Sequence, residues 1–187
     1  MTKIVLHGGE TSQGLDDSPD FFREMLFDIE KNKVNILLVY FARPKAQWDD
    51  LFMDDMTNFE NNTDKECSFL LASLADFEEQ LKQSDIVFFK GGDGPLLIET
   101  ITQYPHFRDL ILGKVLGGTS AGANMFSKLF YSMRGKRVIE GLGILNIRLF
   151  THYRDQYTNE LNTLESYGSN ISETVLLEEG EHKSFRI

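Results

Sequence analysis

A serine stands at the centre of a glycine-rich segment of the form G-x-S-x-G, Gly118-Thr119-Ser120-Ala121-Gly122. A short apolar run precedes this segment, and apolar residues at helical spacing follow it between positions 123 and 130. The pattern is typical of a strand that turns sharply into a helix with a nucleophilic serine at the turn. The free amides at the start of such a helix favour negative charge on a bound carbonyl oxygen. The segment predicts acyl-transfer chemistry at Ser120, although a glycine-rich turn can also serve packing or anion binding.

An activated serine needs a base within hydrogen-bond reach. His152 ends an apolar strand downstream of the serine, and His7 ends the first strand of the chain. Because the carboxyl ends of strands in an open α/β sheet form one crevice, position favours His152, with His7 second. We expect His106 and His182 to lie at the surface.

The base in turn needs an acidic group that orients it. The candidates are Asp155 and Glu160, which follow His152, and Glu178 and Glu179, which close the last predicted strand. Side chains alternate along a strand, so only one of Glu178 and Glu179 can point inward. The residues alone leave this choice open.

A glycine pair, Gly91-Gly92, follows the apolar run at 85–89. Its backbone N–H groups can lie beside Ser120 and form an oxyanion hole together with the N–H of Ala121. Neither G-x-G-x-x-G nor a Walker lysine accompanies the pair, which argues against a phosphate site.

Apolar runs alternate with amphipathic segments along the chain. Strands are expected at 3–6, 34–41, 67–74, 85–89, the run ending at 116, 147–152 and 173–179, and helices at 18–29, 48–59, 76–83, 95–101, 107–112, after 121, and 157–167. This alternation predicts an α/β fold, with a mostly parallel sheet covered by helices on both faces. No repeat or linker interrupts it, so we expect a single domain over 1–187.

Composition limits the possible partners and compartment. The chain has 187 residues and a net charge of −10, with no basic cluster, so nucleic acid and anionic membranes are poor partners. Cys67 is its one cysteine, which excludes an internal disulfide and favours a reducing compartment. With no signal-peptide pattern and no apolar segment long enough to span a bilayer, we expect a cytoplasmic protein.

Several motifs occur in an order that resembles the peptidase E (aspartyl dipeptidase) and cyanophycinase family of serine peptidases. They are FFKGGDGPLL, GGTSAGANM, GLGIL, His152-Tyr153 and LEEG. The resemblance runs from Lys3 to about Gly180 and implies a three-layer α/β/α fold like that of class I glutamine amidotransferases (flavodoxin-like).

The resemblance also implies roles for individual residues. Ser120 would be the nucleophile, His152 the base and Glu179 the orienting acid, with the amides of Gly92 and Ala121 as the oxyanion hole. No metal or organic cofactor is implied.

Departures from the family pattern concern the substrate. Asp93 replaces a neutral asparagine, and its carboxylate would repel an anionic substrate side chain. The arginine-rich segment that recognises a P1 aspartate is shortened, and Arg154 is its only cation. If Arg154 or Arg148 reaches the pocket, a P1 aspartate can still be recognised; otherwise a broader dipeptidase or esterase is expected.

The main expectation is hydrolysis of a small peptide by a monomer or homodimer. The alternatives are a non-catalytic, amidotransferase-like binding domain and a broader esterase or amidase. A glutamine amidohydrolase is disfavoured, because the nucleophile of those enzymes is cysteine.

Overall fold

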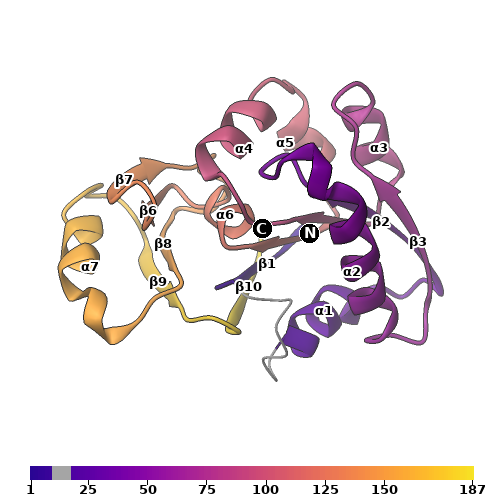
Figure 1. Cartoon of the computed structure of the whole chain (residues 1–187), viewed down its shortest axis with the longest axis horizontal. Coiled ribbons are helices and arrows are strands. Elements are labelled where there is room, and N and C mark those ends of the chain that lie inside the picture. Colours follow the sequence, from indigo (N-terminus) through magenta and orange to yellow (C-terminus); the bar gives the residue numbers. More distant parts are fainter. Residues whose placement is uncertain (10–17) are drawn as a thin grey trace.

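The computed structural model describes residues 1–9 and 18–187, in which the strands form two sheets (Figure 1). The larger sheet has the order β10-β1-β5-β4-β2-β3. Its strands are β1 (Lys3–His7), β2 (Lys33–Val39), β3 (Glu66–Leu71), β4 (Ile86–Phe89), β5 (Val115–Thr119) and β10 (His182–Arg186). Strands β1 to β5 run parallel, and β10 pairs antiparallel with β1.

Helices cover both faces of this sheet. They are α1 (Ser18–Phe27), α2 (Trp48–Glu60), α3 (Phe77–Gln83), α4 (Gly94–Ile101) and α5 (Phe107–Leu110), with a 3-10 turn, η1, at Lys45–Gln47. An apolar core lies on each face of the sheet, and alternate residues of β1 belong to the two cores. Val5 packs in a cluster with α1 and α2, whereas Ile4 and Leu6 pack with α3, α4 and α5. Burial on both faces explains why the central strands read as continuous apolar runs.

The second sheet has the order β7-β6-β8-β9. Its strands are β6 (Leu129–Ser132), β7 (Arg137–Glu140), β8 (Ile147–Thr151) and β9 (Glu173–Leu177), and the 3-10 turn η2 (Asp155–Tyr157) and α7 (Thr158–Glu165) follow β8. Leu149 and Val175 of this sheet belong to the same core cluster as Ile4 and Leu6 of β1. The two sheets therefore share a core, and Figure 1 shows them side by side.

The α/β class, with mostly parallel strands and helices, is confirmed, but the sequence pattern did not indicate two sheets. Two local predictions are wrong. The helix after Ser120, α6, spans only Ala121–Asn124, and Leu129 and Phe130, which were expected to lie on it, belong to β6. The charged tail, in which His182 was expected to be solvated, forms β10, where His182 pairs with His7 of β1.

The termini are joined as well. The backbone amide of Thr2 donates to Ile187, and that of Ile187 donates to Thr2. No helix within residues 1–9 and 18–187 has the length and apolar character needed to cross a membrane.

Candidate active site

Ser120 lies at the turn between β5 and α6, with φ 50° and ψ −113°. Few residues other than glycine adopt this backbone, which is held by hydrogen bonds on both sides. The Ser120 amide donates to the carbonyl of His7 (3.0 Å), and its carbonyl accepts from the Asn124 amide (2.8 Å). A Cβ on Gly122 would lie 2.0 Å from the Phe89 carbonyl oxygen, so only glycine fits beside β4. The strand-to-helix turn predicted for this segment is present.

Ser120, His152 and Glu179 form one chain of hydrogen bonds. The Nε2 atom of His152 lies 2.8 Å from Ser120 Oγ, and its Nδ1 lies 3.1 Å from Glu179 Oε1. His152 follows β8 directly and has a φ of 56°. Its ring is two-thirds buried, so one edge remains open to solvent.

The structure distinguishes the candidate acids. Glu179 lies in the turn after β9, and the hydrogen bond from His152 lowers the pKa of its carboxyl group; burial opposes this effect, and Arg154 adds to it. Glu178 and Asp155 are exposed, and within the described residues neither bonds to His152. The prediction that both glutamates lie on the last strand is wrong, because β9 ends at Leu177 and the turn after it, not strand alternation, directs Glu179 to His152.

Two residues with unbonded backbone amides line the pocket beside the serine. Gly92 and Ala121 line the same pocket as Ser120, and neither amide donates to an acceptor among the described residues. Both are therefore available to a bound oxygen.

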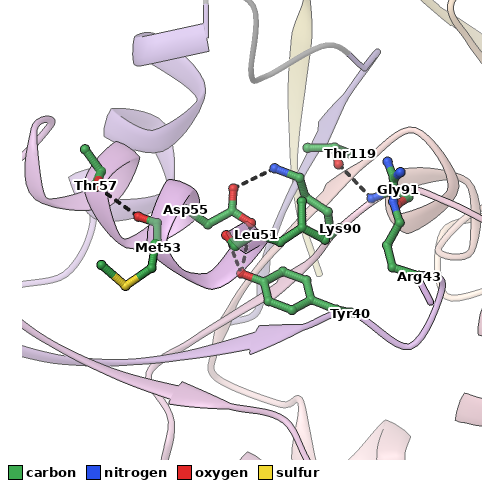
Figure 2. A network of polar contacts seen from close by, with 9 residues as sticks. All are labelled: Tyr40, Arg43, Leu51, Met53, Asp55, Thr57, Lys90, Gly91 and Thr119. Carbon is green, nitrogen blue, oxygen red and sulfur yellow. Dashed lines mark hydrogen bonds and ion pairs between the residues drawn. The ribbon is translucent and has the colours of Figure 1, made fainter. Parts of the chain in front are cut away.

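The loop that carries Gly92 is fixed on several sides. The amide of Gly91 donates to Thr119 Oγ1 (3.0 Å), and its carbonyl accepts from Arg43 Nε. The amide of Asp93 donates to the Ala42 carbonyl (2.9 Å). Figure 2 shows the contact between Gly91 and Thr119, with Arg43 beside Gly91.

A buried polar network lies under this loop (Figure 2). Lys90 Nζ is 2.6 Å from Asp55 Oδ1, and both side chains are almost fully buried. Tyr40 Oη lies 3.0 Å from Asp55 Oδ2. Burial raises the pKa of Asp55, whereas Lys90 lowers it. The sequence did not predict this ion pair, because an isolated Asp and an isolated Lys in separate segments carry no local signal that they pair.

The pocket beside the serine has a volume of about 550 Å³. One wall consists of Ser120, His152 and Gly92, and the other comes from the β6–β7 hairpin, including Arg134 and Arg137. Neither arginine was among the residues expected at the site from the sequence. The expectation of no basic cluster overlooked Arg134, Lys136 and Arg137, which lie within a span of four positions.

The expected substrate-binding residues have different surroundings. Asp93 lines the pocket, where its Oδ1 caps α4 by accepting from the Leu96 amide (3.1 Å) and its Oδ2 lies 3.7 Å from Arg134. Arg154 does not line the pocket and instead donates to Glu179 Oε2 (3.2 Å). Arg148 bonds to carbonyls at Tyr167 and Gly168, also outside the pocket.

His7, the second candidate base, is fully buried in β1. Its Nδ1 accepts from the Gly9 amide (3.1 Å), and it has no hydrogen bond to Ser120 Oγ among the described contacts. Burial, with a smaller effect of His182, lowers the pKa of His7 from 6.5 to about 4. His7 is therefore neutral at physiological pH. The described residues contain no group of three or more His, Cys, Asp or Glu arranged to hold a metal ion.

Comparison with known proteins gives a family and a fold. The sequence profile of Peptidase family S51 matches residues 4–183. The structure of a peptidase from an acI-B1 Actinobacterium is similar, with a TM-score of 0.73 and 20% identity over 100% of this chain and 84% of that one. A candidate peptidase E protein from Listeria monocytogenes EGD-e gives a TM-score of 0.65 and 14% identity, covering 100% and 99% of the two chains. No curated protein matches significantly.

Proposed function

Because the chain belongs to Peptidase family S51, a family of serine-type peptidases, we propose that it hydrolyses short peptides through Ser120, His152 and Glu179. The observation that carries this proposal is the continuous hydrogen-bond chain, 2.8 Å from serine to imidazole and 3.1 Å from imidazole to carboxylate. At these distances a base can take the proton of a hydroxyl nucleophile, and a carboxylate can orient that base.

In the first step, Ser120 Oγ attacks the scissile carbonyl and His152 Nε2 takes its proton. The Glu179 carboxylate accepts from Nδ1–H and stabilises the imidazolium that forms. The carbonyl oxygen becomes an oxyanion within reach of the amides of Gly92 and Ala121, which stabilise it. His152 then gives the proton to the leaving amine.

In the second step, water replaces the amine. His152 takes a proton from that water as its oxygen attacks the acyl carbonyl. The bond between the acyl carbon and Ser120 Oγ then breaks, His152 returns the proton to Oγ, and the acid product leaves. The strained backbone of Ser120 holds Oγ towards the pocket throughout, so little reorganisation is needed between the steps.

The pocket supports a preference for an acidic residue at the acyl side of the scissile bond. Arg134 and Arg137 line it, and Asp93, the one carboxylate among the described residues of its wall, is paired with Arg134. Excess positive charge in a partly enclosed pocket favours a carboxylate side chain. We assign this role to the hairpin rather than to Arg154.

The test compares the wild-type protein with Ser120→Ala on a panel of dipeptides varied at the first residue, and on an activated ester. We expect the variant to lose hydrolysis and fluorophosphonate labelling while its Tm stays unchanged. A wild-type protein that neither cleaves any member of the panel nor reacts with the probe would instead be a non-catalytic binding domain. Turnover of the ester alone would indicate a broad esterase.

A further inference from the structure

Three consecutive carbonyl groups at the end of β1 contact the three segments that carry the proposed triad. The His7 carbonyl accepts from the Ser120 amide (3.0 Å), and the Gly8 carbonyl accepts from the His152 amide (3.1 Å). The Gly9 carbonyl accepts from the amide of Gly180 (3.2 Å), the residue after Glu179. One short stretch of backbone thus links groups that lie far apart in the sequence.

Gly9 also contacts the imidazole. A Cβ built on Gly9 would lie 2.1 Å from Cε1 of His152, 2.6 Å from Nε2 and 2.8 Å from Nδ1. Real side chains do not approach so closely, and an ordinary contact begins at 3.4 Å. The bare backbone of Gly9 therefore forms a surface on which the ring rests.

We infer that residues 7–9 are a positioning element for the proposed triad, and that Gly9 sets the position of the His152 ring. This inference rests on the proposed function. Gly9 neither binds substrate nor transfers a proton; it acts through His152.

The point of contact explains why a small change here would matter. Cε1 is bonded to both ring nitrogens, so pushing it outward moves Nε2 away from Ser120 and Nδ1 away from Glu179 together. The ring would have to move by roughly 1 Å, a displacement that can cost about 100-fold in rate. Substrate contacts with the hairpin wall would not change.

The first experiment is Gly9→Ala with a matched control. Gly9 has a φ of 127°, so alanine adds backbone strain as well as the ring contact. Gly143→Ala is the control, because Gly143 also has a positive φ (63°) and a Cβ there meets nothing within 4 Å. We expect Gly9→Ala to lower kcat about 100-fold with KM unchanged, and to displace the pH–rate limb of the base. The control should keep wild-type kcat.

A second experiment separates the ring contact from the backbone strain and does not depend on activity. If the ring causes the clash, removing it should relieve part of the effect of Gly9→Ala on stability. We therefore expect the loss in Tm caused by Gly9→Ala to shrink by at least half in a His152→Ala background. If Gly9→Ala alone does not fold, the double variant should recover folded protein.

These outcomes distinguish the two proposals. Wild-type kcat in Gly9→Ala, or an equal loss in Tm in both backgrounds, overturns the role of Gly9 and leaves the proposed function intact. A wild-type protein that shows no hydrolysis, together with relief of the Tm loss in the double variant, refutes the proposed function but retains the contact. A rise in KM with unchanged kcat would also contradict the inference that Gly9 positions the His152 ring.

Discussion

The carboxylate of Glu179 accepts hydrogen bonds from two side chains, His152 and Arg154. A charged acceptor on Nδ1 fixes the tautomer that leaves Nε2 free to accept the serine proton. The shared carboxylate also lies close enough to solvent for its charge to be partly screened.

Glu179→Gln should lower kcat by about 100-fold or more, because a neutral amide stabilises the imidazolium less and can present its NH₂ group to Nδ1. Steady-state kinetics on the best dipeptide measures this effect. The control is Glu178→Gln, which changes the exposed neighbour that has no bond to His152. Equal losses in both variants would mean that the effect is not specific to the triad.

Arg134→Gln should raise KM for dipeptides with a first Asp or Glu about threefold, while turnover of a neutral activated ester stays unchanged. The removed guanidinium faces the pocket and pairs with Asp93, whose carboxylate then repels an acidic substrate. Lys136→Gln removes a cation from the same hairpin but outside the pocket lining. A KM that rises in both variants would indicate long-range attraction instead of local recognition.

At the scale of elements, the loop between β4 and α4 has to hold the Gly92 amide against Ser120. Lys90 begins this loop, and its ammonium group is buried against Asp55 of α2. Removing the Asp55 carboxylate would take a charge-assisted hydrogen bond from a buried ammonium group, and losing one partner of a buried ion pair destabilises a fold.

Asp55→Asn should therefore lower the free energy of unfolding by about 2 kcal/mol, measured by urea denaturation. Asp54→Asn is the matched control, because Asp54 is an exposed acid one position earlier on the same helix. A loss no larger than that of the control would show that Asp55 is not charged in the folded protein.

The sequence predicted elements well where the local pattern was strong. The apolar runs at 34–41 and 85–89 became β2 and β4, because strands buried on both faces leave a continuous apolar signal. The residues after Asn124 have helical spacing, yet they pair with β7 and β8. Long-range pairing overrode local periodicity there, and a single sequence carries no record of such pairing.

The site shows the same division. Ser120, His152 and Glu179 were identified by motif order and strand ends, and the structure brings the three side chains together. Arg134 and Arg137 were missed because their hairpin belongs to the second sheet. Arg154 was expected in the pocket from its nearness to His152 in sequence, but the turn directs it to Glu179.

For the whole molecule, acid stability is affected by His7, which is buried at the junction of both sheets. Its pKa is about 4 in the folded protein and 6.5 ordinarily. Between these values the unfolded chain binds a proton that the folded protein does not, so the free energy of unfolding falls as the pH is lowered from 6.5 to 4.

This single group should remove up to about 3 kcal/mol of stability across that range. Chemical denaturation at several pH values measures the slope, which should be shallower in His7→Gln. His106→Gln, at a residue before α5 and outside the core, serves as the control. The prediction fails if the slopes of wild type and His7→Gln coincide.

The single-domain organisation and the oligomeric state stay predictions.

The two-sheet architecture has a consequence for the protein during synthesis. The serine emerges 32 positions before its imidazole partner, and the carboxylate follows a further 27 positions later. A ribosome-bound chain that ends before β9 thus contains Ser120 but lacks Glu179, the carboxylate that contacts His152. On the proposed mechanism, the chain therefore acquires hydrolytic competence only near the end of its synthesis.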